Sequence, residues 1–260
     1  MGLIVFTGKR RSGAASEFKP DERWLRRGLK SAYLLQPGLW DRNLVTGAIG
    51  GSIVGTGVKF SGDKLVTANS TANYALLAHG IATNIALPVS FAVGCVKTAG
   101  SVAWSLLRTD ASAWNGWFGE GTGISSASAG SFDGSAASVG ARSFVGCHAN
   151  GSDLRSFSPG FGLAVDTSAP SPLSVNTTQV CLGAARRSTV DNAAAAEFTH
   201  FFAFQGALDN SALAELAGDY MRLFKPKPIW VPVSAASGPP TLAAIAASDL
   251  TASGARLTVT

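Results

Sequence analysis

Residues 87–97, LPVSFAVGCVK, alternate apolar and small side chains along nearly their whole length. Successive residues of a β-strand point to opposite faces of a sheet, so every second residue of this stretch lies on the same face. That face comprises Val89, Phe91, Val93 and Cys95. The alternation therefore predicts a long strand with one apolar face.

Shorter strand-like segments surround this one, separated by turn signals at intervals of roughly 8–15 residues. Strands in this arrangement form antiparallel sandwiches or barrels, and the lack of alternating helices excludes a parallel α/β sheet. The further candidate strands are residues 29–35, 51–62, 64–68, 102–110, 113–121, 137–148, 160–166, 179–187 and 196–208. The sequence predicts an all-β antiparallel sandwich.

One segment, residues 208–226, has a helical period instead. Asp209 or Asn210 can cap its start, and Pro226 ends it. Its predicted apolar face comprises Leu213, Leu216, Tyr220 and Leu223. This predicts one short amphipathic helix after the last strand of the sandwich.

Positive charge is concentrated at the N-terminus of a chain that carries +5 overall. Eight of the 21 Lys and Arg residues fall in the first thirty: Lys9, Arg10, Arg11, Lys19, Arg23, Arg26, Arg27 and Lys30. Residues 1–23 are therefore predicted to form a basic arm, with a short strand near its start, that either contacts an acidic partner or stays solvated. Arginines and aromatics do not interleave there, so no specific nucleic-acid binding is expected.

The C-terminal part, residues 227–260, begins as a Pro-rich extended segment and ends in two strand-like runs. These runs are too short for a stable domain of their own. They are expected to pair with the main body, to pair with another copy, or to begin a further β module. The predicted division is thus an arm at 1–23, a sandwich at 24–226 and an extension at 227–260.

The three cysteines, Cys95, Cys147 and Cys181, are sparse and flanked by apolar residues or glycine. They predict buried thiols, and they fit synthesis in a reducing cytoplasm better than a disulfide framework. The longest apolar runs fall well short of the roughly 18 residues needed to span a bilayer, so no membrane partner is expected.

Four segments, in order, carry a resemblance to a known family: RGLKSAYLLQPGLWDRNLVTG (27–47), GTGVKFSGDKLV (55–66), VSFAVGCVK (89–97) and EFTHFFAFQGALDNSALAELAGDYMRLFKP (197–226). Together they resemble the laminin-G-like, concanavalin A-like jelly roll of many bacteriophage structural proteins. One departure is Cys95, which stands where that family carries a tryptophan.

The resemblance implies a non-enzymatic virion protein, made in the cytoplasm of a host bacterium, that decorates or cements a capsid or tail. Its implied partners are major capsid or tail proteins, and a homo-oligomer is the expected state. Terminal extensions suit attachment through added strands. The candidate attachment residues are Lys9, Arg10 and Arg11 in the arm and Ile229, Trp230 and Val231 in the extension.

The alternative function is that of a lectin-like module for host surface glycans, and it rests on SAWNGWFGEGTG (112–123). Flat aromatic faces hold sugar rings, and in an extended strand Trp114 and Glu120 share one face while Trp117 lies on the other. Trp114, Trp117 and Glu120 are therefore the candidate glycan site, with core packing as the competing interpretation. A glycan-cleaving enzyme is the lesser alternative, since Glu120 has no partner carboxylate nearby in sequence.

The histidines His79, His148 and His200 lack the spacing of a zinc site. His200 is expected on the solvent side of a strand or in a satisfied hydrogen bond. Calcium would use loop aspartates, but these form no alternating cage, so no cofactor is expected and calcium is the one alternative. The aspartates concerned are Asp110, Asp133, Asp153, Asp166 and Asp191.

Overall fold

The computed structural model describes residues 3–5, 15–82, 85–86, 88–106, 117–120, 123–126, 130–132, 142–150, 153–158, 162–166, 174–175, 178–186, 190–225, 229–231 and 257–258. For the strands within 85–86 and 117–175, and for those at the two ends of the chain, it describes the backbone and its pairing.

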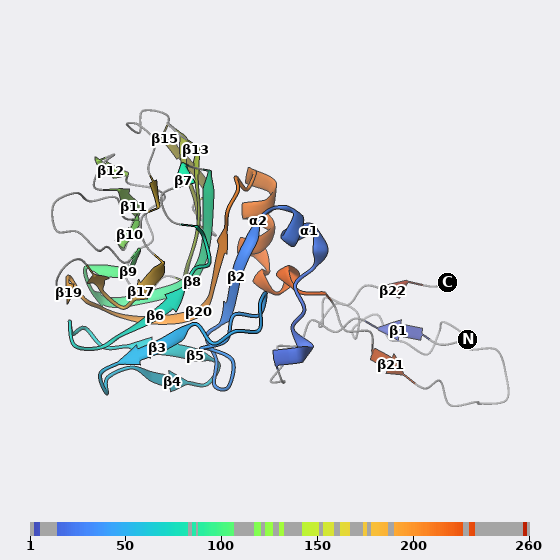
Figure 1. The fold of residues 1–260 in the computed structure, drawn as a ribbon, viewed down its shortest axis with the longest axis horizontal. Helices are drawn as coiled ribbons and strands as arrows, with labels where there is room; N and C mark the ends of the chain where they lie inside the picture. Colours follow the sequence, from blue (N-terminus) through green and yellow to red (C-terminus); the bar gives the residue numbers. More distant parts are fainter. Residues whose placement is uncertain are drawn as a thin grey trace.

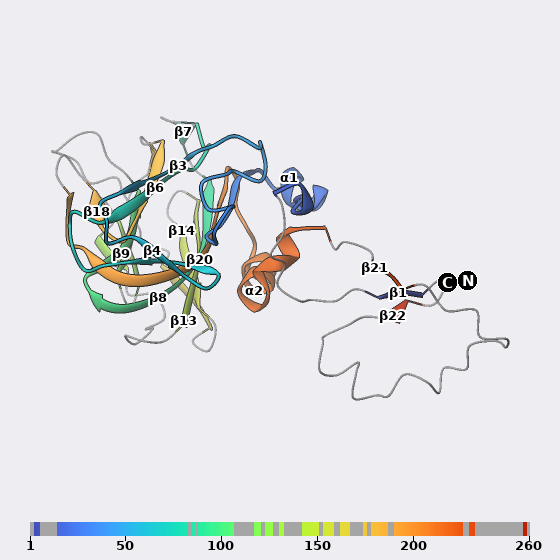
Figure 2. The same ribbon diagram turned by 90° about the horizontal axis from the view of Figure 1, so that it is seen from below.

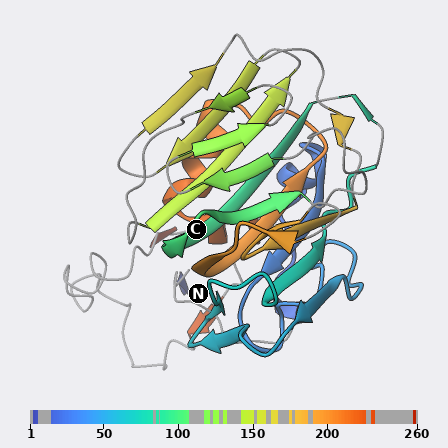
Figure 3. The ribbon, with the colours of Figure 1, turned by 90° about the vertical axis from the view of Figure 1, so that its left-hand side faces the viewer.

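Two antiparallel sheets stack face to face, which confirms the predicted sandwich (Figures 1 and 3). The seven-stranded sheet has the order β12 (Gly130–Phe132), β11 (Gly123–Ser126), β10 (Trp117–Glu120), β9 (Val102–Leu106), β17 (Gln179–Leu182), β6 (Tyr74–Ala78), β3 (Gly51–Val54). The eight-stranded sheet has the order β15 (Gly162–Asp166), β14 (Asp153–Ser158), β13 (Arg142–Asn150), β8 (Val89–Gly100), β20 (Ala194–Phe204), β5 (Lys64–Thr67), β4 (Lys59–Ser61), and β2 (Leu29–Leu34) also pairs with β20.

Smaller elements complete the fold. Two further sheets have two strands each: β7 (Ile85–Ala86) pairs with β16 (Ser174–Val175), and β18 (Ala185–Arg186) pairs with β19 (Val190–Asp191). The helical elements are η1 (Ala15–Glu17), α1 (Glu22–Arg26), α2 (Asn210–Gly218) and η2 (Tyr220–Leu223).

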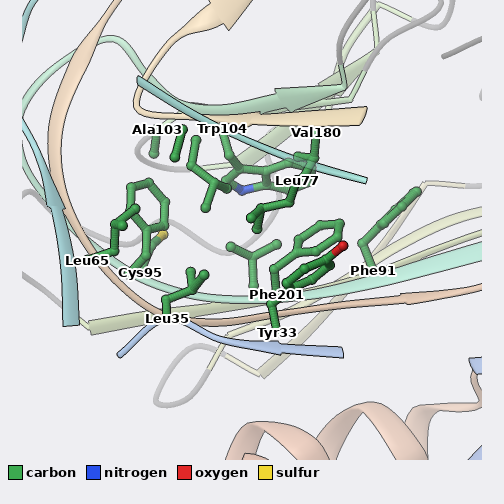
Figure 4. Close-up of a cluster of buried hydrophobic side chains, with 14 of the residues drawn as sticks. Tyr33, Leu35, Leu65, Leu77, Phe91, Cys95, Ala103, Trp104, Val180 and Phe201 are labelled. Atoms are coloured by element: carbon green, nitrogen blue, oxygen red, sulfur yellow. The ribbon is translucent and has the colours of Figure 1, made fainter. Parts of the chain in front are cut away.

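The main core fills the space between the two sheets (Figure 4). Val89, Phe91, Val93 and Cys95, predicted to share one face of β8, all line it. Phe91 stacks on Phe201 of β20 with ring centroids 6.1 Å apart, and Trp104 of the opposite sheet lies 6.4 Å from Phe91. Trp104 is fully buried, so the two sheets are joined by interlocking aromatic rings.

A second core covers the other face of the eight-stranded sheet. Phe202 and Phe204 of β20 pack there against Trp24 of α1 and Leu213 of α2. The two helices therefore lie on the side of the molecule away from the seven-stranded sheet (Figure 1). Because both of its faces are covered, this sheet carries long apolar runs rather than simple alternation.

The second core includes residues that we assigned to the basic arm. Phe18 is buried, with its ring 5.6 Å from that of Phe224. Pro20 forms a bridge with Phe224, and the Asp21 amide donates to the Leu223 carbonyl at 2.8 Å. The packed domain thus begins by residue 15 and not at Trp24, because an apolar residue within a charged segment supplies part of its core.

The C-terminal helix starts where the sequence predicts and ends earlier. Asp209 is the N-cap, since its Oδ1 accepts from the Ala212 amide at 2.7 Å. The α-helix stops at Gly218 because Asp219 takes an extended conformation and caps the 3₁₀ turn η2. Leu213, Leu216 and Leu223 of the predicted apolar face are buried, and Tyr220 is half-buried.

The two ends of the chain form a third sheet with the order β21 (Ile229–Val231), β1 (Leu3–Val5), β22 (Leu257–Thr258). It lies beyond the helices, away from the sandwich (Figure 2). Leu3 pairs with Val231 and Val5 with Leu257. Of the two strand-like runs predicted at the C-terminus, the structure describes part of the second, β22, which pairs with the N-terminal strand. The strand β21 lies in the segment that the sequence predicts as an extended linker.

Replacing Phe18 with alanine tests whether residues 15–23 belong to the domain. We expect the free energy of unfolding to fall by about 3–5 kcal/mol, because the change opens a cavity in the second core. Replacing the exposed neighbour Lys19 with alanine should change it by less than about 0.5 kcal/mol. If both substitutions changed the free energy of unfolding equally in chemical denaturation, residues 15–23 would be a detached arm and not part of the domain.

Candidate functional site

The predicted glycan residues fall on or beside β10, and Trp114 lies outside the described residues. Trp117 pairs with Ser126, and Gly119 pairs with both Ile124 and Trp104. The strand therefore lies inside the seven-stranded sheet, between β9 and β11, within the candidate strand 113–121. The register shifts between Gly119 and Glu120, which marks a bulge. The role of the Trp117 and Glu120 side chains stays a prediction.

The predicted attachment residues divide into two groups. Lys9, Arg10 and Arg11 lie outside the described residues, while Ile229, Trp230 and Val231 form β21 of the terminal sheet. In that sheet Trp230 pairs with Ile4, and Ile229 pairs with Val5. These residues are thus joined to the N-terminal strand of the same chain.

Part of the positive charge near the N-terminus is neutralised within the domain. Arg23 donates from both terminal nitrogens to the Glu215 carboxylate, at 2.7 and 3.2 Å. Arg27 lies 3.3 Å from the Asp209 carboxylate. Both guanidinium groups also lie over the Trp24 ring, at 5.0 and 5.5 Å from its centroid. These arginines hold α1 against α2, so they do not form a free basic surface.

Among the aromatic side chains that the structure describes, all but three are buried. The exceptions are Trp40, Phe60 and Tyr220, which are half-buried. The Tyr220 ring stacks on His200 with centroids 4.2 Å apart and an interplanar angle of 18°, so one of its faces is occupied. Trp40 and Phe60 are therefore the described aromatic rings best able to meet a ligand.

Trp40 and Phe60, here called the edge pair, close one edge of the sandwich. Phe60 lies on β4, the last strand of the eight-stranded sheet, and Trp40 packs beside Gly51 at the start of β3, the last strand of the other. Their ring centroids are 6.2 Å apart at an angle of 51°. Both rings pack against the main core on one side. The edge pair therefore spans the gap between the two sheets.

The segment that carries Trp40, residues 35–50, is held by hydrogen bonds rather than by regular structure. The buried Asn43 side chain accepts from the amides of Ala32 and Val45 at 3.2 and 3.0 Å and donates to the Lys30 carbonyl at 3.1 Å. The amides of Gly50 and Gly51 donate to the Asp41 carbonyl at 2.8 and 3.0 Å. These hydrogen bonds fix the backbone of the segment around Trp40 and Asp41.

The carboxylate of Asp41, next to Trp40 in the chain, acts on the phenol of Tyr33. The Tyr33 hydroxyl donates to the Ala78 carbonyl at 2.9 Å. Burial, and then the negative charge of Asp41, raise the pKa of Tyr33 to about 12. Tyr33 therefore stays neutral, and the half-buried Asp41 is close enough for its charge to act on that ring.

The outer face of the seven-stranded sheet is partly covered in the region of β6 and β17. Tyr74, Leu76 and Cys181 point to this face and pack with Ala184 and Ala193. The chain segment that follows β17 therefore covers these strands. Cys95 and Cys181 are buried, as predicted, and Cys147 lies on β13, where only the backbone is described.

His200 is buried under η2, and the expected solvent-facing position is wrong. Its ring stacks between Phe202 at 4.8 Å and Tyr220 at 4.2 Å, in space left by Gly94. Its Nδ1 is 3.0 Å from the Thr199 hydroxyl, so the expected hydrogen bond is present. Burial lowers the pKa of His200 to about 3, which keeps the ring neutral near pH 7.

The glutamates whose side chains form described contacts are engaged in ion pairs. Glu197 pairs with Lys64, Glu215 with Arg23, and Glu22 with Lys225 at 2.9 Å. Lys225 also lowers the pKa of Glu22. Within the described part of the chain, no group of three His, Cys, Asp or Glu residues could hold a metal ion. No described helix is long and apolar enough to cross a membrane.

The sequence matches no protein-family model and no curated protein. Solved structures share its fold. Domain 4 of AbnA, a GH43 extracellular arabinanase from Geobacillus stearothermophilus solved in complex with arabinotriose, is similar with a TM-score of 0.53 at 13% identity. The match covers 73% of this chain and 98% of that domain.

Two larger proteins are similar over part of their length. A mutant of Trypanosoma rangeli sialidase that displays trans-sialidase activity has a TM-score of 0.57 at 11% identity, over 76% of this chain and 34% of the sialidase. The binding domain of Paraclostridial Mosquitocidal Protein 1 has a TM-score of 0.52 at 10% identity, over 75% of this chain and 53% of that domain. At these identities the likeness establishes the sandwich fold, and the phage assignment stays a prediction.

Because His200 is buried in its neutral form, we expect the free energy of unfolding to fall when the pH is lowered. Because its pKa is lower in the folded than in the unfolded chain, this residue destabilises the fold as the pH drops below about 6.5 toward 3. Between pH 7 and pH 5 the cost is about 2 kcal/mol. Replacing His200 with leucine should remove that part of the pH dependence in chemical denaturation. An unchanged slope in the variant would contradict the assignment.

Proposed function

We propose that this chain is a carbohydrate-binding module that works without catalysis. The observation that carries the proposal is its likeness to nearly the whole of a domain solved with arabinotriose. The likeness to a sialidase and to a toxin's binding domain supports the same class of function. Because a fold alone hosts many functions, the ligand must be tested directly on this chain.

The described carboxylates support binding rather than cleavage. Glycosidases use two carboxyl groups in one site, one of which is held protonated by its surroundings. Glu22, Glu197 and Glu215 are each engaged in an ion pair, and Lys225 lowers the pKa of Glu22. Asp209 and Asp219 cap helices through their side chains. Glu120 is the remaining candidate carboxylate whose role in cleavage must be tested by mutation.

The full chain is expected to bind at least one class of oligosaccharide on a glycan array. Incubation with the bound glycan should leave it intact by chromatography, and replacing Glu120 with glutamine should leave that result unchanged. Binding to no glycan would refute the proposed function. Turnover that disappears in the Glu120→Gln variant would instead establish a hydrolase.

The virion role stays a second hypothesis, and one observation favours it. The strands β1, β21 and β22 form a separate sheet beyond the helices, where both ends of the chain meet (Figure 2). Two of its three strands lie at its edges, and edge strands can accept a strand from a neighbouring protein. In this hypothesis the terminal sheet attaches the module to a particle.

A chain lacking residues 1–14 and 229–260 tests this attachment. Its melting temperature should lie within about 2 °C of that of the full chain, since both cores are built from residues 15–225. Glycan binding should also be retained, while sedimentation of assembled particles should no longer carry the module with them. Normal incorporation of the shortened chain would end the attachment hypothesis.

A further inference from the structure

We propose that the edge pair is the platform on which this module stacks a sugar ring, and that Trp40 supplies the main face. The inference rests on the proposed carbohydrate-binding function and gives it a place in the fold. That place differs from β10, because β9, β17 and β6 separate β10 from β3 in the sheet.

The first argument is exposure. A sugar-stacking ring must be fixed on one side and open on the other. Trp40 and Phe60 fit this requirement better than the other described aromatic rings, since each packs against the main core and is only half-buried. The other half-buried aromatic ring that the structure describes, Tyr220, already has a face covered by His200.

The second argument is that the Trp40 ring is held in place before any ligand binds. A β-carbon at Gly51 would lie 3.0 Å from Cζ3 of the Trp40 ring and 2.6 Å from Cα of Asp41. Only glycine therefore allows β3 to approach this ring so closely. The Trp40 amide also donates to the Gln36 carbonyl at 3.1 Å. A platform fixed in advance loses little entropy on binding.

The third argument is the polar group beside the ring. The Asp41 β-carbon and the Trp40 ring both lie within 3.1 Å of where a Gly51 β-carbon would stand, so they flank the same point of β3. A carboxylate accepts hydrogen bonds from sugar hydroxyls. Arg42, next in the chain, is engaged with the Gly47 carbonyl at 2.6 Å. The site thus offers a sugar hydroxyl a carboxylate acceptor beside the Trp40 ring.

The test compares Trp40→Leu and Phe60→Leu with the matched control Ile49→Ser in the full chain, using isothermal titration with arabinotriose and with the strongest ligand from the array. Leucine keeps an apolar plug in the sandwich edge but removes the flat face. We expect Trp40→Leu to weaken binding about tenfold and Phe60→Leu to weaken it less. Ile49, an exposed residue of the same segment, should leave affinity unchanged when replaced.

Circular dichroism and melting curves will show whether each variant is folded. If Trp40→Leu does not fold, the affinity of Phe60→Leu tests the edge site. Unchanged affinity in both leucine variants, with a loss in Trp117→Ala, would overturn the edge site and keep the proposed function. No glycan binding by the unmodified chain would remove the function and the edge site together.

Discussion

The rest of the molecule depends on strand β20, whose two faces are both buried from His200 to Phe204. Phe201 and Ala203 contact the core between the sheets, whereas Phe202 and Phe204 contact the core under the helices. A polar group on this stretch must form a hydrogen bond, as His200 does with Thr199, because an unpaired polar group would lose its contact with water. The eight-stranded sheet therefore needs a cover on its second face, and α1, α2 and η2 supply it.

That cover explains the course of both ends of the chain. The segment before β2 and the segment after β20 must cross the same face of the sheet, so they meet there. Hydrogen bonds from the Asp21 amide to the Leu223 carbonyl and from the Lys225 amide to the Lys19 carbonyl, both at 2.8 Å, join them side by side. Trp24 adds a bond from its indole nitrogen to the Arg222 carbonyl at 3.0 Å. Both termini thus leave the domain from its helical side.

The sequence predicts most of the sandwich, because alternation is a local signal. The inward face of β8 and the Asp209 cap can both be derived from neighbouring residues alone. Helix α1 was missed since it has a single turn, and its arginines suggest an arm until Glu215 is placed beside Arg23. The burial of His200 was missed for a similar reason, because the FTHFFAF run gives no sign that a helical turn covers it.

The candidate site was the hardest part to predict, and the reason is topological. Trp40 lies in an irregular segment and Phe60 in a three-residue strand, twenty positions further along the sequence, so no periodic pattern links them. They meet only because β3 and β4 are the outermost strands of two different sheets on the same side of the sandwich. An edge of this kind must be closed by large side chains, or the core would be open to water.

Closing the edge and binding a ligand place compatible demands on these rings. Closure requires apolar contact with the core, and each ring keeps a part of its surface exposed. The helical side carries both termini, while the edge pair lies between the outermost strands β3 and β4. A module held by its termini would therefore keep this edge exposed. If several copies of the module were attached to one particle, binding of one copy to a glycan surface would raise the effective concentration of glycan for the other copies. The separation of the edge pair from the termini is thus the feature that would let a small binding site act on a surface.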